Sequence, residues 1–361
     1  MAKGRLWFAD PFADALTAVA LRAGAADRGE ITLAADLALL QDCGLLTQLV
    51  RDCLPGGNAL AGAELLRQIG RASLSVGRLA EGHANALLLI QLYGTSAQRQ
   101  AAAETAAKRA VFGVWGADGK DPVTLRTFQE GTVSLCGAKR FCSGIGLITR
   151  AVVPVRTREG PQLVIVEVSD PARGDISDWQ VSGMRATASG SYDLTDLEAQ
   201  LLGDVNDYQC EPHFEGGIWR YCAVHCGGLE ALVEQARQHI LARDQSQDPH
   251  QRARFAQLAC HAHTARLWVD AACKAVESTG RAETVPQVLL AREVVEQACV
   301  AGIQLTERIM GTAAFASRSD ADRIRRDLAF FLRQANLDGK LDTAAQALLA
   351  PNAPEIGEAF R

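Results

Sequence analysis

The sequence has no excess of basic residues. It contains 37 Lys and Arg against 42 Asp and Glu, a net charge of -5 with histidine neutral. Proteins held to nucleic acid by phosphate contacts carry the opposite balance, so we expect no nucleic-acid partner. No run reaches the roughly 18 apolar residues that a membrane-spanning helix needs, and Asp10 and Pro11 interrupt the start, where a signal peptide would be apolar. The sequence therefore predicts a cytoplasmic protein without a membrane segment.

Several ligand-binding motifs are also missing. No G-x-G-x-x-G opens a strand-helix unit and there is no Walker loop, which argues against a nicotinamide-binding Rossmann domain and against nucleotide hydrolysis. The ten cysteines are scattered from Cys43 to Cys299 without a compact framework. In a chain of this length that distribution favours reduced, mostly buried thiols over disulfides.

Two short patterns resemble metal ligands. Cys222 and Cys226 flank His225, and His261 and His263 are two residues apart. On a helix the two latter side chains would point about 200° apart, so they could not share an ion. No third ligand lies at a fitting spacing, and we predict no metal site.

The length of 361 residues allows two or three domains. The composition, 48% hydrophobic and 22% charged, is that of a folded soluble protein. Over residues 1–109 the apolar residues recur every three or four positions, which predicts four or five helices, the last capped by Ser96. Residues 110–205 contain β-branched and aromatic runs at 111–115, 152–157 and 163–168, which predict a small all-β domain. Pro154 makes the second run an expected edge or bulged strand.

Helical periodicity returns in residues 206–361. The pattern predicts long helices over residues 214–243, 249–279, 285–314 and 319–334 and a shorter one ending near 349. Four long amphipathic helices in succession indicate a bundle. The expected architecture is thus α+β: a helical domain, a β-domain and a four-helix bundle.

The predicted β-domain contains the string Gly137-Ala138-Lys139-Arg140-Phe141-Cys142-Ser143-Gly144. It is similar to the G-x-K-x-[WF]-x-[TS]-[NG] string of the acyl-CoA dehydrogenase superfamily, and the resemblance extends over nearly the whole chain. The resemblance implies bound FAD, with Phe141 against the flavin ring, the Ser143 hydroxyl near its reactive nitrogen, and Cys142 in the same site. An apolar aromatic wall and nearby hydrogen-bond donors suit an isoalloxazine. The alternative is that Phe141 belongs to the β-domain core and Ser143 to a turn.

Two further strings extend the resemblance. In the segment 111–125 the family's Thr-Glu-Pro is replaced by Trp115-Gly116-Ala117, but the main-chain N–H groups of Val114 and Trp115 are still expected to reach the flavin, since such bonds ignore side-chain identity. The segment 183–190 resembles the G-[MLI]-R-x-[ST]-x-[ST] string that leads into the last β-domain strand. We interpret it as a marker of the fold.

The bundle carries a second part of the implied FAD site. Gly227 and Gly228 lie where the family's first long helix packs closely. Arg243 lies where family members bind the FAD pyrophosphate of a neighbouring subunit, and guanidinium suits that contact; the Phe-Gly usually following it is absent, and the alternative is a solvated helix end. Of the string that meets the adenosine, only Gly311 matches clearly. Completion of the site across subunits implies a homotetramer or at least a dimer.

The family's catalytic base is missing. A glutamate normally follows an Arg-Asp pair and takes the α-proton of the acyl thioester while hydride goes to the flavin. Arg326-Asp327 is present, but Gln334-Ala335-Asn336 occupies the glutamate position, and Trp219 occupies the other known position. Neither glutamine nor tryptophan accepts that proton, so the catalytic residues stay unassigned.

Other ionisable residues lie near these positions in the sequence. Glu211 and Glu215 precede Trp219 and are possible replacements for the base, although surface carboxylates are the commoner case. His213 and His225 are two further candidates, for which a purely structural role is again the commoner case. His225 lies among apolar helix residues, where a histidine usually belongs to the core.

Three functions remain open at this stage. The leading hypothesis is an FAD-dependent oxidoreductase that acts on an acyl thioester of CoA or a carrier protein with an altered base site. Within the same fold, a flavin-dependent monooxygenase would need no α-proton base. A non-catalytic assembly protein that has lost FAD is the third.

Overall fold

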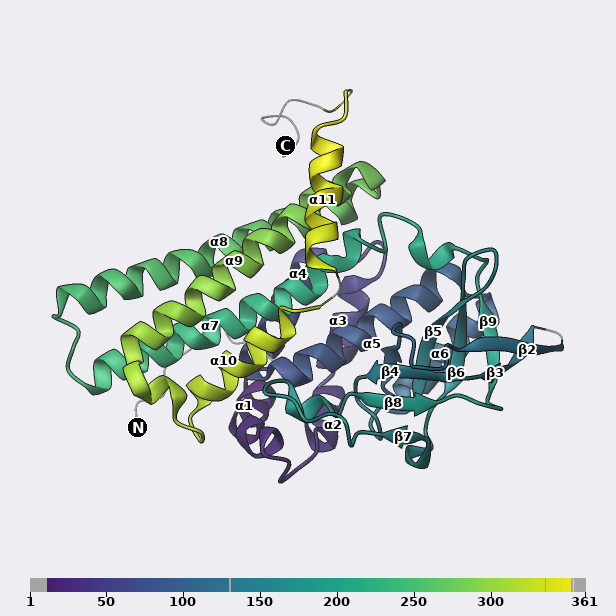
Figure 1. The fold of residues 1–361 in the computed structure, drawn as a ribbon, viewed down its shortest axis with the longest axis horizontal. Coiled ribbons are helices and arrows are strands. Elements are labelled where there is room, and N and C mark those ends of the chain that lie inside the picture. Colours follow the sequence, from purple (N-terminus) through teal and green to yellow (C-terminus); the bar gives the residue numbers. More distant parts are fainter. Residues whose placement is uncertain (1–11, 130, 335, 352, 354–361) are drawn as a thin grey trace.

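The computed structural model describes residues 12–129, 131–334, 336–351 and 353, so Asp10 and Pro11 at the chain start and Ala335 lie outside the described residues. Helices come first, then strands, then helices again, and the sheets lie at one end of the molecule (Figure 1). This is the α+β order that the sequence predicts. The boundaries at 109/110 and 205/206 remain a prediction.

The N-terminal region holds six α-helices among its described residues, against four or five predicted. They are α1 (Ala13–Asp27), α2 (Ala34–Asp42), α3 (Leu45–Cys53), α4 (Ala59–Ala72), α5 (Leu74–Tyr93) and α6 (Ser96–Ala107). Ser73 separates α4 from α5 because its backbone is extended and its hydroxyl accepts the Val76 N–H, which caps α5. The cap of α6 is Thr95 rather than Ser96: its hydroxyl accepts the Gln98 N–H, and the Gln98 side chain accepts the Thr95 N–H.

The β-domain contains two sheets. The first has the order β1-β5-β6-β9-β3-β2 and the second the order β4-β8-β7. The strands are β1 (Phe112–Val114), β2 (Thr124–Gln129), β3 (Thr132–Cys136), β4 (Ala138–Cys142), β5 (Arg150–Arg156), β6 (Pro161–Glu167), β7 (Gly174–Asp175), β8 (Gly190–Asp193) and β9 (Glu198–Leu202). β1 and β5 run parallel, and the other pairs are antiparallel. The 183–190 segment leads into β8, and one more strand, β9, follows it.

Pro154 does not make β5 an edge strand, so that expectation was wrong. β5 lies between β1 and β6. The Val152 carbonyl faces β1 and accepts the Trp115 N–H, and strand alternation turns Pro154 to the same side. Because β1 ends at Val114, no ladder partner is present where proline lacks its N–H, and the Pro154 carbonyl accepts a hydrogen bond from Lys139 Nζ instead.

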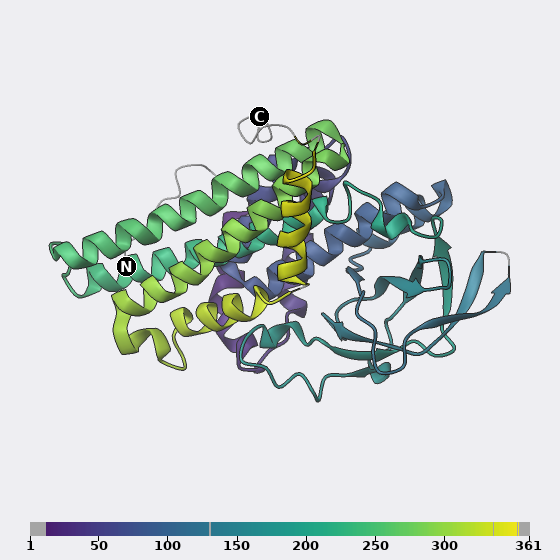
Figure 2. The same ribbon diagram turned by 45° about the horizontal axis from the view of Figure 1, so that its top comes forward.

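The C-terminal region is a helical bundle, and the turned view of Figure 2 shows it extending away from the sheets. Its helices are α7 (Trp219–Ala242), α8 (Pro249–Thr279), α9 (Val285–Met310), α10 (Asp320–Phe331) and the shorter α11 (Leu337–Leu348), which packs against α9. Two predicted boundaries shift because 3-10 turns occupy Gly216–Ile218 before α7 and Gly311–Phe315 after α9. The bundle prediction is otherwise confirmed.

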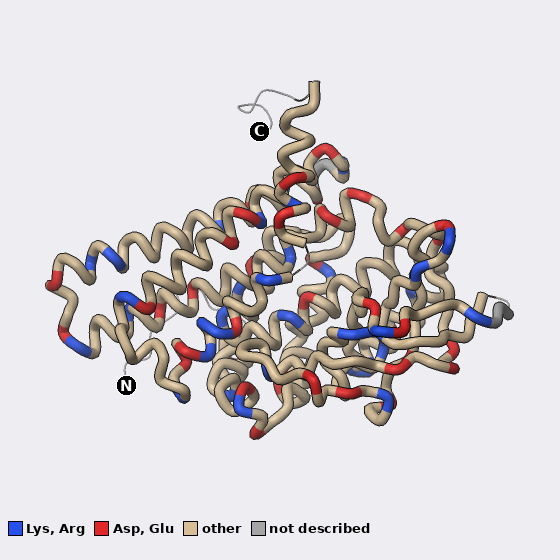
Figure 3. The backbone as a smooth tube through the Cα atoms, viewed as in Figure 1, with Lys and Arg blue, Asp and Glu red and all other residues tan. Residues whose placement is uncertain are grey.

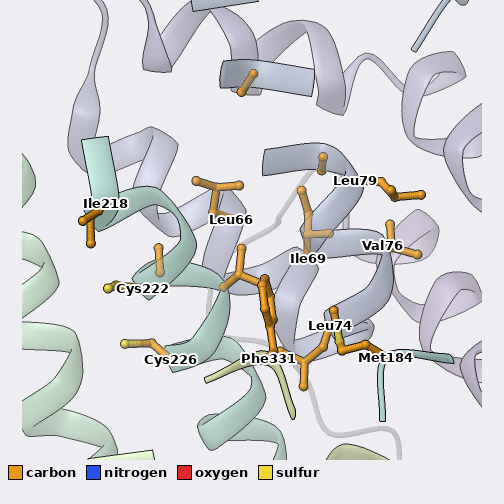
Figure 4. Close-up of a cluster of buried hydrophobic side chains, with 14 of the residues drawn as sticks. Leu66, Ile69, Leu74, Val76, Leu79, Met184, Ile218, Cys222, Cys226 and Phe331 are labelled. Carbon is orange, nitrogen blue, oxygen red and sulfur yellow. The ribbon is translucent and has the colours of Figure 1, made fainter. Parts of the chain in front are cut away.

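One apolar core joins the three regions. Figure 4 shows side chains of α4 and α5 beside Cys222 and Cys226 of α7, together with Met184 of the β-domain and Phe331 of α10. Close approach of α4 and α7 depends on glycine: a Cβ atom on Gly227 would lie 2.0 Å from the Arg67 carbonyl oxygen. The core therefore fixes the β-domain against the bundle through a few side chains.

The charged residues are intermingled along the backbone, as Figure 3 shows. No helix among the described residues is long and apolar enough to cross a membrane. All ten cysteines lie in described segments and are free thiols.

Candidate active site

A cavity of about 650 Å³ lies where the β-domain meets α5 and the end of α10. It brings together residues that are far apart in the sequence: Val114 at the end of β1, Phe141 and Ser143 around the end of β4, and Gln334 after α10. Of the sequence-predicted residues, these line the cavity. Trp115, Cys142, Arg243, Gly311 and Trp219 do not.

A bulge in β4 turns Phe141 into the cavity. Lys139 pairs with Tyr192 and Cys142 with Gly190, so three steps on β4 match two on β8. The extra residue leaves Phe141 with a φ of 54° and 54% exposed, although Lys139, two residues earlier in the strand, and Cys142, the next residue, are buried. A left-handed backbone is unfavourable for a residue with a Cβ atom and is often kept at functional sites.

Three aromatic rings form one wall of the cavity. The Phe141 and Trp179 ring centroids are 6.3 Å apart at 64°, and those of Trp179 and Phe330 are 5.5 Å apart at 88°. These edge-to-face contacts join the β-domain to α10. Trp179 Nε1 also donates to the Met184 carbonyl at 3.2 Å, which holds this ring in place.

Hydroxyl groups form another part of the lining. Ser143 Oγ is 2.8 Å from Ser189 Oγ, which is 2.8 Å from Thr187 Oγ1. The Thr187 hydroxyl in turn lies 2.8 Å from the Met184 carbonyl oxygen. The 183–190 segment thus contributes to the cavity directly, a role that its sequence alone did not reveal.

Trp115 and Cys142 differ from expectation. The Trp115 N–H donates to the Val152 carbonyl at 3.1 Å, so it is not free for a flavin. The Trp115 ring is buried, and its Nε1 donates to the Ser143 carbonyl at 3.1 Å, which supports the cavity from behind. Cys142 is fully buried, and burial raises the pKa of its thiol, so it is an inert core group.

Lys139 fastens the loop after β1 to β4 and β5. Its Nζ lies 2.5 Å from Asp118 Oδ1 and donates to the carbonyls of Pro154 at 2.7 Å and Gly116 at 3.3 Å. The side chain is 1% exposed, so these contacts are necessary to compensate its buried charge. Gly116 and Ala117, which this contact holds, line the cavity. The only sequence signal was a lysine at an inward-facing strand position.

The Arg326-Asp327 pair links three regions rather than forming part of the cavity. Asp327 is buried and accepts the Met184 N–H at 2.6 Å. Burial raises the pKa of Asp327 to about 6, opposed by the Arg323 charge. Arg326 bonds to Asp27 of α1 at 2.7 Å and to the Ser182 carbonyl at 2.6 Å.

No carboxylate lines this cavity among the residues that the structure describes; its charged lining groups are Arg78 and Arg333. Arg78 forms an ion pair with Glu81 at 2.6 Å, and Arg333 pairs with Glu296. Gln334, which the resemblance places at the family's glutamate position, lines the cavity.

The other residues at the two expected base positions offer no described carboxylate to the cavity. Ala335 is outside the described residues, and Asn336 begins α11 without lining the cavity. Trp219, which the resemblance places at the other base position, is completely buried beneath the Arg220 guanidinium.

Two of the other candidate residues, Glu215 and His213, line a neighbouring cavity of about 270 Å³, which shares Val114 with the first. Glu215 lines it and forms an ion pair with Lys340. The Glu211 carboxylate accepts the N–H groups of Glu215 and Gly216, so it organises the turn before α7. His213 lines this second cavity, and burial lowers its pKa.

His225 is a core residue. Its ring meets Phe331 edge-on at 4.5 Å, and burial lowers its pKa to about 3, so it is neutral. Cys222 and Cys226 are each 1% exposed. Within the described parts of the chain, no group of three or more His, Cys, Asp or Glu could hold a metal ion.

Arg243 and Gly311 lie at the end of the bundle away from the sheets, at the C-terminal ends of α7 and α9 (Figures 1 and 2). Gln251 links the two turns, since its Nε2 donates to the Ile309 carbonyl at 3.2 Å and to Gln245 Oε1 at 3.3 Å. Arg243 and Gly311 are both exposed. Neither lines the cavity within one chain.

Comparison with known proteins identifies the fold. FMN-bound TdsC from Paenibacillus sp. A11-2, a dibenzothiophene monooxygenase, has a TM-score of 0.80 and 20% identity over 96% of this chain and 98% of its own. Butyryl-CoA dehydrogenase from Megasphaera elsdenii has a TM-score of 0.80 and 16% identity over 96% and 100%. For the methanesulfinate monooxygenase MsuC from Pseudomonas fluorescens the values are 0.77 and 20%, over 97% and 98%.

No protein-family model and no curated protein sequence matches the chain. The chain has the acyl-CoA dehydrogenase fold over nearly its whole length, as its sequence predicts.

Proposed function

We propose that this chain is a flavin-dependent oxidoreductase that binds FAD noncovalently in the 650 Å³ cavity. Three features support the proposal: a volume in the range of ligand sites, an aromatic wall headed by Phe141, and hydroxyl groups at Ser143 and Ser189. An exposed phenylalanine on a strained backbone is otherwise unfavourable, and an apolar ring face is the ligand surface that it fits.

Within this class we propose a monooxygenase rather than an acyl-CoA dehydrogenase. The observation that carries this choice is the lack of any carboxylate among the described residues that line the cavity. Removal of an α-proton requires a base within hydrogen-bond reach, whereas a reduced flavin that reacts with O₂ supplies oxygen chemistry without that step. Phe141 and Trp179 would exclude water from the ring face, and Ser143 would hydrogen-bond the ring edge. TdsC and MsuC, which share the fold, are monooxygenases by name.

Oxidation of an acyl thioester, on CoA or a carrier protein, is the second candidate. The second cavity favours it, because the carboxylates of Glu81 and Glu215 line that cavity beside Val114. Each of them is held in an ion pair, with Arg78 and Lys340 respectively. A base would have to leave its cation before it could accept a proton, and we therefore place this candidate second.

The FAD site would be completed by a second copy of the chain. Arg243 and Gly311 lie together on the exposed end of the bundle and cannot reach the cavity of their own chain. A homotetramer or dimer would allow them to bind the pyrophosphate and adenosine in trans. FMN, which TdsC binds, lacks the adenosine and would not need them.

The test begins with mass spectrometry of the small molecules released on denaturation, followed by reconstitution with FAD and with FMN. The flavoprotein is then reduced chemically without oxygen and mixed with O₂ in a rapid-scanning spectrometer. A spectrally distinct species between the reduced and oxidised flavin is expected. Direct return to the oxidised spectrum, together with reduction by an acyl-CoA, would favour the second candidate. A colourless protein that neither flavin reconstitutes would leave only the non-catalytic role.

A further inference from the structure

The second cavity adjoins the proposed flavin cavity, and Tyr208 lies where the two meet. Both cavities are lined by Val114. Tyr208 lines the second cavity, and its hydroxyl oxygen is 3.7 Å from the point where a Cβ atom on Gly116 would lie. Gly116 itself lines the flavin cavity, so this hydroxyl lies at the boundary between the two spaces. A molecule in the second cavity would therefore lie beside the proposed flavin site.

The Tyr208 hydroxyl is free to bind a ligand. It has no hydrogen-bond partner among the described residues, and protein atoms do not enclose it completely. An edge-to-face contact with Phe214, with ring centroids 5.1 Å apart at 64°, holds its ring in place. Burial raises the pKa of Tyr208, so the hydroxyl keeps its proton near neutral pH and can donate it. The cavity thus offers one fixed, uncharged donor.

Tyr221 lines the same cavity but does not offer its hydroxyl to it. That hydroxyl is also without a partner among the described residues, but protein atoms cover it. The Tyr221 ring contacts the ring of His225, with centroids 5.4 Å apart. Of these two tyrosines, only Tyr208 can exchange a hydrogen bond with a molecule in the cavity.

The charged groups that line the second cavity are already paired. Glu81 and Glu215 are each held in an ion pair. Arg220 is buried, its Nε donates to Asn85 Oδ1 at 2.5 Å, and its Nη1 lies 3.8 Å from Glu277. A charged ligand would find no unpaired group of opposite sign here to compensate its loss of water. The cavity therefore favours an uncharged molecule.

The other walls are mainly apolar and the space is small. Leu88 and Leu89 come from α5, and Phe214 and Ile218 come from the turns before α7. The volume of about 270 Å³ lies below the roughly 300–1,000 Å³ of sites for drug-sized ligands. A compact molecule with an apolar body fits these walls, whereas a saturated hydrocarbon chain would leave the Tyr208 hydroxyl unbonded.

We propose that the second cavity binds the substrate of the monooxygenase, that this substrate is a compact, uncharged molecule with an apolar body and one hydrogen-bond acceptor, and that Tyr208 is the residue that selects for the acceptor. The inference rests on the proposed function, because it assigns the substrate side of the proposed flavin site. The Tyr208 O–H donates to the acceptor, and the apolar body lies against the leucine and phenylalanine side chains. Selection follows because a molecule that lacks the acceptor leaves this donor unpaired.

The experiment measures the binding of three probes by equilibrium dialysis. They are 2-naphthol, 2-methylnaphthalene, in which a methyl group replaces the hydroxyl, and 2-naphthoate, which carries a charge. In Tyr208→Phe the affinity for 2-naphthol should fall roughly tenfold relative to that for 2-methylnaphthalene, because one neutral hydrogen bond is lost. Tyr221→Phe is the matched control, and its ratio of the two affinities should equal that of the parent. The parent should bind 2-naphthoate more weakly than 2-naphthol.

A second measurement locates the probe. The visible absorbance of the flavin-loaded parent should shift when 2-naphthol binds, because the probe lies beside the flavin. The proposal would be overturned by a parent that does not bind 2-naphthol, by an unchanged ratio of affinities in Tyr208→Phe, by the same change in Tyr221→Phe, or by tighter binding of 2-naphthoate. A chain that shows the Tyr208 dependence but binds neither FAD nor FMN would instead contradict the proposed function and leave the selectivity of the second cavity standing. Circular dichroism checks that each variant is folded.

Discussion

The buried carboxylate of Asp327 accepts the main-chain N–H of Met184 at 2.6 Å. This hydrogen bond joins α10 to the segment that carries Thr187 and Ser189, so it fixes the bundle against one wall of the cavity. Because Arg326 on the same helix holds the Ser182 carbonyl, the β-domain segment is anchored at two successive points.

Asp327→Asn should remove a pH-dependent contribution to stability. Burial raises the pKa of Asp327 from 3.8 to about 6 in the folded state, so the folded chain binds a proton more tightly than the unfolded chain. The parent should therefore lose up to roughly 3 kcal/mol as pH rises from about 4 to about 6, and no more above that. The asparagine oxygen still accepts the Met184 N–H but does not titrate. Thermal midpoints of both proteins across pH 4–7 test this, and profiles that run parallel would refute it.

Phe141→Ala should weaken flavin binding by roughly 1–3 kcal/mol, because an apolar contact with the ring face is lost. Phe315→Ala is the matched control, since Phe315 is 51% exposed but does not line the cavity. Fluorescence titration with FAD gives both affinities. If the two variants bind FAD equally well, Phe141 does not belong to the site.

Arg243→Ala should weaken FAD binding more than FMN binding and should do so only in an oligomer. The guanidinium is expected to reach the pyrophosphate of a neighbouring chain, and a charge-assisted contact of this kind contributes about 1.5–3 kcal/mol. Arg252→Ala, which removes another exposed arginine of the bundle, serves as the control. Analytical ultracentrifugation supplies the oligomeric state. A monomer that binds FAD with full affinity would contradict both the oligomer and the role of Arg243.

Gly227→Ala should destabilise the fold through the α4–α7 contact. Its Cβ atom would lie 2.0 Å from the Arg67 carbonyl oxygen and 2.6 Å from the Arg71 nitrogen, so backbone must move. Overpacking of this kind costs about 1–3 kcal/mol or more. Gly24→Ala in α1 meets only the flexible end of Arg28 at 3.3 Å and should stabilise by up to about 1 kcal/mol. Equal thermal midpoints for the two variants would mean that α4 and α7 can separate freely.

Regular helical periodicity and local strings identified the fold, because long amphipathic helices and the 137–144 string are local features of the sequence. The predictions were wrong where the position of a strand or the cap of a helix depends on contacts with other residues. Pro154 is tolerated inside a sheet only because β1 stops at Val114, and the length of β1 is not evident from β5. Thr95 rather than Ser96 caps α6, because the Thr95 hydroxyl accepts the Gln98 N–H and the Gln98 side chain accepts the Thr95 N–H.

The cavity was predicted only in part for a similar reason. Phe141 and Ser143 could be placed from one string, but Ser189 meets Ser143 across 46 residues of sequence, and no local pattern announces that contact. Trp115 was assigned a free N–H that the sheet in fact uses. Strand alternation alone would also have buried Phe141, and the bulge that exposes it depends on pairing with β8.

The proposed flavin cavity lacks a base for α-proton removal. The most direct test of this property mixes the flavin-loaded protein with straight and branched acyl-CoAs in the absence of oxygen and follows the visible flavin absorbance, with dithionite as the control that the flavin can be reduced. Since no carboxylate lines the cavity among the described residues, and neither Gln334 nor Trp219, which the resemblance places at the base positions, ionises near neutral pH, the absorbance should stay unchanged with every acyl-CoA. Rapid bleaching by a simple acyl-CoA would contradict the claim, and Glu81, Glu211 and Glu215 would then be the first residues to replace.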